Sequence, residues 1–464
     1  MKYLLGFFIL ICCFSSANAG PKIFIDVGEA RVRKSKLALP AFQYLGAKSS
    51  GTKNTSGDEL YSVINNDLAA TGLFISIDPN AYLENPMTTG LRPASVVPNG
   101  FDFANWKTIE TEFLIRGGFQ IINNTLILEI YGYYVPQGTL VLGKKYEGPA
   151  SSARKIAHTF ADDFVKAVTG KPGFFKSQIV VAIDNGVKTN REIYVADWDG
   201  HDAYPVTNHK TITVSPTWSK NGNYIAYTAY AKRVVNGLAR RNPDLFMYEF
   251  KTKRRWLVSY RDGLNSGAEF LPDNKHMLLT LSRASQTGTA DIYKMTLDGT
   301  SISPITRGPG SAMNVEPAVS PDGRTIAFSS DRSGKPMIYT MSMNGENVKK
   351  LTHAGNYNAT PSWSPDGKKI AFAGFDNDRN NFDIFLINAD GSGIIRLSSA
   401  RKTNDKWSNN EDPAFSPDGR HVLFVSDRTG TKQLYLVNID GSNERRITYD
   451  GKFYSKPKWG PLVE

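Results

Sequence analysis

The chain has almost no cysteine: of its 464 residues, only Cys12 and Cys13 are cysteines, and both lie near the N-terminus. The remainder of the chain can therefore form neither a disulfide nor a thiolate metal site. The chain also lacks the G-x-S-x-G nucleophile elbow of serine hydrolases and any H-x-x-x-H or C-x-x-C spacing. These absences exclude a disulfide-stabilised fold and argue against the common hydrolase and zinc-enzyme classes.

Long hydrophobic runs are missing as well. No apolar run after residue 20 is long enough to span a membrane, and the run at residues 4–14 is too short. This short run follows the basic Met1-Lys2-Tyr3 and precedes Ala17-Asn18-Ala19, which has the A-x-A pattern of a signal cleavage site. We expect a secretory signal peptide over residues 1–19, cleaved between Ala19 and Gly20, and therefore an exported protein.

Acidic residues are outnumbered: 55 lysines and arginines against 44 aspartates and glutamates give a net charge of +11. The basic residues are scattered, with small clusters at residues 31–36, 232–241 and 251–255. Because an exported protein meets little nucleic acid, we expect no nucleic-acid partner. The charge fits either an ordinary basic surface or a face complementary to an acidic partner or an anionic membrane.

One phrase recurs through the C-terminal part of the chain. Each copy places an aromatic or apolar residue before a tight turn such as Ser-Pro-Asp-Gly, and successive centres are 44 to 52 residues apart. A period in this range with strand-like content predicts a β-propeller. The copies are SPTWSKNG (215–222), GAEFLPDN (267–274), EPAVSPDG (316–323), TPSWSPDG (360–367), DPAFSPDG (412–419) and the truncated KPKWG (456–460).

Strand-like segments follow each copy in a constant order. After the turn comes a segment such as TIAFSS (325–330), and then one such as DIFLINADG (383–391), which ends in a hairpin turn. The latter type of segment occurs six times, and the final copy of the phrase has none after it. We therefore predict six blades, with the C-terminal strand completing the first blade so that no edge stays open.

The residues before the repeats predict a small α/β domain. A hairpin is expected over residues 112–135, turning at Asn123-Asn124, and apolar residues recur at helical spacing after residue 56 and over residues 151–170. The predicted fold class is thus a two-domain α+β and all-β chain. Its parts are a signal peptide at 1–19, an α/β domain at 20–170, a linker at 171–176 and the propeller at 177–464.

The export signal, the N-terminal α/β domain and six units of the type PxWSPDGxxIAF…DIYxxxxDG, closed by a terminal PxW strand, together resemble the TolB family. The resemblance covers the whole chain, and its departures, LPDN and SKNG in place of SPDG, are turn variants. It implies a monomeric, non-catalytic periplasmic component of the Tol–Pal envelope system, without cofactor or metal. That system maintains outer-membrane integrity and the constriction of the outer membrane during cell division.

The resemblance also implies partners and where they bind. A Pal-like peptidoglycan-associated lipoprotein, and some colicins by mimicry, would bind at the propeller mouth, where we expect loops leading into the inner strands. A TolA-like inner-membrane protein would bind the first residues of the mature chain, whose alternating pattern suits β-strand addition. The expected mouth residues are Thr213, Val214, Asn265, Ser266, Val315, Glu316, Asn358, Ala359, Glu411, Asp412, Tyr454 and Ser455. The expected N-terminal residues are Lys22, Ile23, Phe24, Ile25, Asp26 and Val27, which also fit an ordinary edge strand of their own domain.

The enzymatic alternative is an envelope hydrolase or lactonase with a metal ion at the channel mouth. Glu316, Glu411 and Asp412 precede inner strands and could supply carboxylates there. His276 and His421 share one repeat position at the start of a second strand, where we expect solvated strand ends and no metal ligand. Since no catalytic motif is present, we favour a propeller that displays its mouth for recognition.

Overall fold

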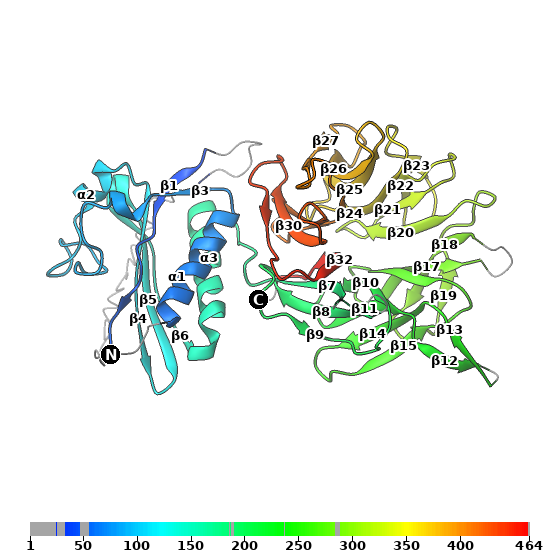
Figure 1. Cartoon of the computed structure of the whole chain (residues 1–464), viewed down its shortest axis with the longest axis horizontal. Helices are drawn as coiled ribbons and strands as arrows, with labels where there is room; N and C mark the ends of the chain where they lie inside the picture. The colour runs from blue at the N-terminus through cyan, green and yellow to red at the C-terminus, as the bar shows by residue number, and fades with distance from the viewer. Residues whose placement is uncertain are drawn as a thin grey trace, which may run out of the picture.

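The structure, a computed structural model, describes Ile25 and residues 33–46, 55–184, 186, 190–235, 237–283 and 288–462. It confirms the predicted fold: a small N-terminal α/β part lies beside a six-bladed β-propeller along the long axis of the molecule (Figure 1). The expected signal peptide, its Ala19–Gly20 cleavage site and most of the predicted N-terminal strand lie outside the described residues. In the described part, no helix is long and apolar enough to cross a membrane.

The N-terminal part is built on one mixed sheet with the strand order β3-β1-β4-β5-β6, in which β2 also pairs with β4. The predicted hairpin forms from β4 and β5 and turns at Asn123 and Asn124, whose φ angles of 47° and 63° are ones that asparagine tolerates. The edge strand β6 escapes prediction because most of its residues are exposed or half-exposed and show no clear apolar face. The strands are β1 (Ser35–Ala38), β2 (Gln43–Tyr44), β3 (Phe74–Ser76), β4 (Phe113–Ile122), β5 (Thr125–Tyr134) and β6 (Thr139–Pro149).

Two long helices cover the sheet on the side that faces the propeller (Figure 1). Leu60, Ile64 and Leu68 form the buried stripe of α1, and Phe160 and Phe164 are fully buried on α3. The α3 helix ends at a left-handed glycine, Gly170, whose N–H donates to the Lys166 carbonyl, as its sequence predicts. The helices are α1 (Thr55–Ala70), α2 (Phe103–Thr108) and α3 (Ala153–Thr169), with single 3-10 turns η1 (Pro79–Ala81), η2 (Val135–Gln137) and η3 (Ala150–Ser152).

The propeller consists of six four-stranded antiparallel sheets, each ordered from the channel outward. Blade 1 is β32-β7-β8-β9, blade 2 is β10-β11-β14-β15, and blades 3 to 6 run through β16–β19, β20–β23, β24–β27 and β28–β31 in sequence order. A separate two-stranded sheet, β12-β13, is inserted in blade 2.

The strand bounds of blades 1 to 3 are β7 (Gln178–Asp184), β8 (Arg191–Asp197), β9 (Tyr204–Pro205), β10 (Thr213–Trp218), β11 (Tyr224–Ala229), β12 (Lys232–Val235), β13 (Leu238–Arg241), β14 (Asp244–Glu249), β15 (Arg255–Ser259), β16 (Asn265–Phe270), β17 (His276–Ser282), β18 (Ala290–Thr296) and β19 (Ile302–Pro304). Those of blades 4 to 6 and the closing strand are β20 (Asn314–Val319), β21 (Thr325–Ser330), β22 (Met337–Ser342), β23 (Lys349–Lys350), β24 (Asn358–Trp363), β25 (Lys369–Asp376), β26 (Asn381–Asn388), β27 (Ile395–Arg396), β28 (Asn410–Phe415), β29 (His421–Ser426), β30 (Gln433–Asn438), β31 (Arg445–Arg446) and β32 (Phe453–Trp459).

The Ser-Pro-Asp-Gly turns join the first and second strands of blades 4 to 6 in one way. In blade 5, Ser364 Oγ donates to Asp366 Oδ1 and accepts from the Lys369 N–H, while the Lys368 N–H donates to the same carboxylate oxygen. Gly367 closes the turn with a φ of 70°, a value that favours glycine. The sequence phrase therefore encodes a turn with its own hydrogen bonds, which sets the register of the two strands.

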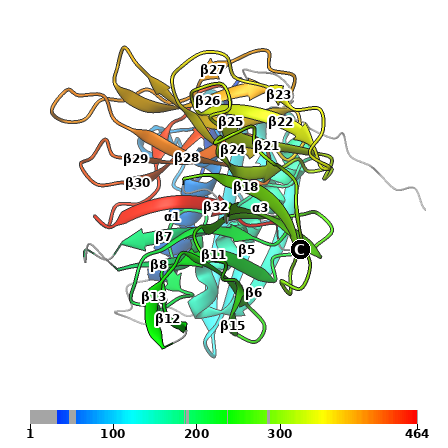
Figure 2. The same ribbon diagram turned by 90° about the vertical axis from the view of Figure 1, so that its right-hand side faces the viewer.

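The C-terminal strand closes the ring, as predicted. β32 pairs antiparallel with β7, from Phe453 opposite Asp184 to Trp459 opposite Ile179. Figure 2 shows these two strands side by side, red against green, although they come from opposite ends of the propeller sequence. The pairing gives β7 an inner neighbour, so blade 1 has the same four strands as the others.

The end of α1 docks on the turns of blade 6. His421 Nε2 lies 3.1 Å from the Ala70 carbonyl, and Asn443 Nδ2 donates to the same carbonyl at 3.2 Å. His421 is completely buried and its ring packs on Phe174. The prediction that His421 is a solvated strand end is therefore wrong, because the N-terminal part covers this position; His276, at the same repeat position, remains partly exposed.

A second buried contact joins α1, α3 and blade 1. His158 Nδ1 of α3 lies 2.7 Å from Asp67 Oδ2 of α1, and Trp198 of blade 1 donates its indole N–H to Asp67 Oδ1 at 3.3 Å. Burial raises the pKa of Asp67 to about 7, although His158 opposes the shift. Burial acts to lower the pKa of His158, but Asp67 outweighs it and raises that pKa above 6.5. Arg154 of α3 also pairs with Asp199 of blade 1 at 2.6 Å.

Removing the closing strand tests its role in stability. Ending the chain after Lys452 deletes β32 and leaves the inner edge of β7 without a partner. We expect the free energy of unfolding to fall by on the order of 5 kcal/mol or more, because buried backbone groups lose their hydrogen bonds. Ending the chain after Gly460 is the control and should leave the melting temperature unchanged. Equal melting temperatures for both truncations would show that β32 does not close the ring.

The buried His158–Asp67 pair predicts a loss of stability as pH rises. Both groups hold protons more tightly in the folded protein than in the unfolded chain, so the folded state binds more protons and its stability falls with increasing pH. Between pH 6 and pH 9, the unfolding free energy of the wild type should therefore decrease more than that of the Asp67→Asn/His158→Gln variant. Urea denaturation at several pH values measures both, and parallel pH profiles would contradict the assignment.

Candidate functional site

The inner strands of all six blades carry an irregularity at the same place, where the strand begins at the channel mouth. One residue in each has a positive φ between 50° and 60°. In five blades this residue is not glycine, and each such residue costs roughly 1 kcal/mol in this left-handed conformation. Because strained backbone gathers at functional positions, this ring marks a candidate site. The six bulge residues are Ser215, Gly267, Glu316, Thr360, Asp412 and Lys456.

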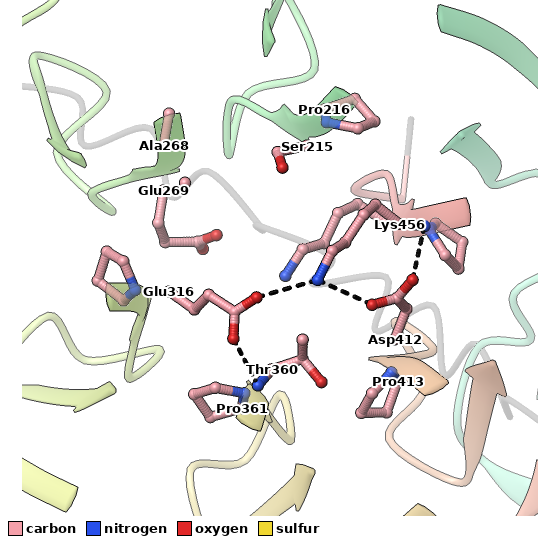
Figure 3. Close-up of a pocket in the computed structure, with 14 residues that line it drawn as sticks. Ser215, Pro216, Ala268, Glu269, Glu316, Thr360, Pro361, Asp412, Pro413 and Lys456 are labelled. Atoms are coloured by element: carbon pink, nitrogen blue, oxygen red, sulfur yellow. Dashed lines mark hydrogen bonds and ion pairs between the residues drawn. The ribbon is translucent and has the colours of Figure 1, made fainter. Parts of the chain in front are cut away.

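An ion-pair network spans the channel through this ring (Figure 3). Lys456 Nζ of blade 1 lies 2.9 Å from Asp412 Oδ1 of the neighbouring blade 6 and 3.0 Å from Glu316 Oε1 of blade 4. Blade 4 stands three blades away from blade 1 in either direction around the ring, so the ammonium reaches across the channel. The network therefore links the closing strand to the opposite side of the propeller.

The two carboxylates also bind backbone of the next bulge around the ring. The Thr360 N–H donates to Glu316 Oε2 at 2.9 Å, and the Lys456 N–H donates to Asp412 Oδ2 at 3.0 Å. Each acid thus holds the strained backbone of the following blade as well as the central ammonium. The bulges of blades 2 and 3, at Ser215 and Gly267, carry no charge.

Asp412 and Lys456 of the network each favour the charged form of the other. Burial acts to raise the pKa of Asp412, but the charge and hydrogen bonds of Lys456 hold it below its usual value. Burial acts to lower the pKa of Lys456, and Asp412 and Glu316 raise it above its usual value. A third of each of the Lys456 and Glu316 side chains remains exposed, at 34% and 32%, so both are accessible from the mouth.

The pocket around the ring offers fixed charges and little free acid–base chemistry. It is lined by the bulge residues, by the prolines that follow most of them, and by Glu269 and Lys458. Glu269 accepts from Lys220 Nζ at 2.7 Å, and Glu411 pairs with Lys432 away from the Lys456 network. Within the described residues, no group of three or more histidine, cysteine or acidic side chains is placed to hold a metal ion.

The expected mouth residues lie at the mouth, but the prediction that they form loops is wrong. They begin the inner strands themselves, because pairing with the second strands extends beyond the bulge: Thr213 opposes Ala229, and Asn358 opposes Gly374. Seven of them are partly exposed and could face a ligand, namely Val214, Ser266, Val315, Glu316, Glu411, Asp412 and Ser455. The other five are buried, namely Thr213, Asn265, Asn358, Ala359 and Tyr454.

The buried asparagines have a structural role that the repeat phrase does not reveal. Asn265 Nδ2 donates to the Arg261 carbonyl at 2.6 Å, and Asn358 Nδ2 donates to the Ala354 carbonyl at 2.9 Å. Asn314 and Asn410 occupy the same position in blades 4 and 6 and are also buried. A bulky residue at Asn358 would therefore disturb the fold, because this side chain is buried and bonded to the backbone.

Sequence reasoning missed four of the six bulge residues, Ser215, Gly267, Thr360 and Lys456. A signal was available, because the bulge residue is the one immediately before proline in five copies of the phrase. Of the expected N-terminal site, only Ile25 is described; its N–H donates to the Val168 carbonyl of α3 at 2.6 Å, and its side chain packs on the N-terminal core. Lys22, Ile23, Phe24, Asp26 and Val27 lie outside the described residues.

Comparison with known proteins gives one consistent result. Residues 165–405 and 377–463 match the family model of the TolB beta propeller domain, and residues 23–131 match that of the TolB amino-terminal domain. A Tol-Pal system protein TolB from Desulfosudis oleivorans is 31% identical over 303 residues, and one from Syntrophotalea carbinolica is 36% identical over 167 residues. These alignments cover 65% and 36% of this chain, and the chain spans 64% and 37% of the length of these two relatives.

A solved structure supports the fold. The crystal structure of TolB from Acinetobacter baumannii superposes with a TM-score of 0.75, covering 95% of this chain and 100% of that one. Its sequence identity of 24% makes this a likeness of fold. It extends over both parts of the chain, so the N-terminal part and the propeller occur together in both proteins.

Neutralising the central ammonium tests the network. Lys456→Met leaves the Glu316 and Asp412 carboxylates without their shared cation, and we expect the free energy of unfolding to fall by about 1–3 kcal/mol. Adding Glu316→Gln and Asp412→Asn should restore most of this loss, as measured by urea denaturation. Lys458→Met in the same strand is the control, since no ion pair of Lys458 is found among the described residues. If Glu316→Gln and Asp412→Asn did not restore the stability lost in Lys456→Met, the result would contradict the network.

Proposed function

The chain belongs to the TolB family, and on this basis we propose that it is a non-catalytic, protein-binding component of the Tol–Pal system in the periplasm. In this proposal it links a Pal-like outer-membrane lipoprotein to a TolA-like inner-membrane protein. The link would help to maintain the outer membrane and to constrict it during division. The observation that carries the proposal is the ring of six bulge residues at the propeller mouth.

We place the Pal-like partner at this ring and at the partly exposed residues beside it. The inner strands are held by their strand pairing and by the Lys456 network, so they present a rigid surface. A rigid surface loses less conformational entropy when a partner binds. Glu316 and Lys456 remain one-third exposed and offer one charge of each sign. Colicins that imitate the lipoprotein would use the same surface.

We propose that residues 22–27 bind the TolA-like partner by strand addition. The support is local: the Ile25 N–H bonds to the carbonyl of Val168, near the end of α3, and not to a strand of its own sheet. This single backbone contact of Ile25 can be exchanged for a strand of a partner at modest cost. Ile25 also packs on the buried cluster that joins α3 to blades 1 and 6 of the propeller.

The proposal includes no turnover. Glu316 and Asp412, two of the carboxylates considered for a metal-dependent hydrolase or lactonase, both contact the Lys456 ammonium, and Glu411 pairs with Lys432. The Lys456 ammonium thus occupies the carboxylates that a catalytic metal ion at this mouth would need as ligands. A hydrolase and lactonase screen with and without divalent metals should show no rate above background.

One titration series tests the two binding sites separately. Val315→Trp adds bulk at the mouth of blade 4 and should weaken binding of the soluble Pal-like domain of the same organism about tenfold or more, because the ring surface becomes obstructed. Val348→Trp is the matched control, since Val348 lies at the opposite end of the same blade and is exposed. Calorimetry and thermal melting measure affinity and folding for both variants.

Removing residues 20–28 completes the series. The truncated protein should melt at a slightly lower temperature, because the contacts of Ile25 with Val168 and the core are lost. It should keep its Pal-like partner and lose the TolA-like domain. Full TolA-like binding by the truncated protein would remove the N-terminal segment from the proposal. Full Pal-like affinity of Val315→Trp, in a protein that melts normally, would move that site away from the mouth.

A further inference from the structure

A two-stranded hairpin, β12-β13, leaves blade 2 between its second and third strands. Among the described strands it pairs only with itself, and it projects from the end of the molecule opposite the N-terminal part (Figure 1). The insertion leaves blade 2 next to the pair Ala229–Asp244, and Ala229 also pairs with Thr213, where the inner strand begins. The hairpin therefore stands at the same face as the channel mouth.

The base of the hairpin is firmly attached. Asn242, the residue after β13, donates from Nδ2 to the Arg261 carbonyl at 2.9 Å and accepts from the Gly263 N–H at 3.0 Å. These bonds tie the hairpin to the connection that leads into blade 3. A short two-stranded sheet is marginally stable alone in water, so this anchoring fixes its position on the mouth face.

The charged residues of the hairpin are all basic and lie at its base. Its ten residues, KRVVNGLARR, hold four basic residues and no acidic one. In the strand register Lys232 is paired with Arg241, so like charges lie opposite one another at the base. Such pairs are destabilising in a free hairpin, and an anionic surface would relieve the repulsion.

The tip is apolar. Next in the backbone register, Val234 is paired with Ala239 and Val235 with Leu238. Val234 is 73% exposed, more than any other exposed large hydrophobic side chain of the described residues. Lys232 and Arg241 are exposed too, and neither forms an ion pair with a carboxylate in the described part of the chain. The hairpin therefore carries the exposed cations Lys232 and Arg241 at its base and the exposed apolar residues Val234 and Ala239 farther out.

We propose that this hairpin docks the mouth face on a membrane that contains anionic phospholipids, with its apolar tip in the interfacial layer and its basic base at the lipid phosphates. An acidic protein surface is the less suitable occupant, because the part that would meet it first, the tip, has no charge. The interfacial layer of a membrane matches the order of the hairpin: the apolar tip would lie deeper among the acyl chains, and the basic base would lie at the level of the phosphates. The inference rests on the proposed function only in that it places the protein in the periplasm. Docking in this way would orient the mouth toward a membrane-anchored partner.

The test uses vesicles and the full mature chain. We expect it to bind vesicles of phosphatidylcholine with about 30% phosphatidylglycerol, and to bind pure phosphatidylcholine vesicles at least about tenfold more weakly. Lys232→Glu/Arg241→Glu should lower binding to the anionic vesicles about tenfold or more, and Val234→Asp about threefold or more. Lys251→Glu/Lys253→Glu is the matched control: it makes the same charge change at the opposite end of blade 2 and should leave binding within about twofold.

A second measurement reports on the tip directly. Val234→Trp should shift its fluorescence emission to shorter wavelength with anionic vesicles and not with neutral ones, because the indole leaves water. Thermal melting should be unchanged in all hairpin variants, since the hairpin pairs only with itself among the described strands.

Three outcomes would overturn the proposal. They are equal losses for the hairpin and control variants, an absent emission shift, and hairpin variants that bind vesicles normally but lose the Pal-like domain. The last result would assign the hairpin to an acidic protein partner. Because the vesicles contain no protein, failure of this proposal leaves the calorimetric test of the proposed function unaffected.

Discussion

The pairing of β32 with β7 is the constraint on which the rest of the structure depends. A propeller closes only when a strand from the end of its sequence pairs with one from its beginning. Here the seven-residue strand β32 makes this pairing for the whole propeller. The same strand supplies Lys456, which reaches across the channel to Glu316, and Trp459, whose ring packs on Phe174 of the linker. Closure and the charged network of the mouth therefore depend on one segment, which also contacts the linker to the N-terminal part.

The interface between the two parts is a continuous core with polar contacts inside it. Side chains of α3, of the linker and of blades 1 and 6 belong to one buried cluster, and the Asp67 carboxylate accepts from Trp198 within it. Buried ionisable groups add little stability but fix the geometry in which they are satisfied. Ile25 packs on this cluster and bonds to α3, so the proposed exchange at residues 22–27 would change the packing of this cluster. Any coupling between the two proposed sites would be reciprocal.

Most of the architecture followed from local sequence features, because each has a local physical cause. Ser-Pro-Asp-Gly closes its turn with its own side chains, which makes the turns of blades 4 to 6 recognisable in the sequence, and the six segments of the type DIFLINADG count the blades. An unmatched final copy of the phrase requires a partner strand, which predicts closure by β32. Apolar residues at helical spacing defined α1 and α3, and Asn123-Asn124 defined the long hairpin. The edge strand β6 was missed because an exposed strand has no apolar face to detect.

The sequence by itself determined the strands, their turns, the blade number and the closing strand, since all of these depend on residues close together along the chain or on a count of repeats. Only the tertiary structure decided which side chains meet. Lys456 faces Glu316 because six blades place positions 140 residues apart across one channel, and no local pattern encodes that distance. His421 is buried because the end of α1 docks on this turn of blade 6, so two histidines at one repeat position have different surroundings. The candidate site at the mouth therefore depends on the closed ring of blades. The ring brings together residues that occupy the same repeat position in sequence but contact different side chains.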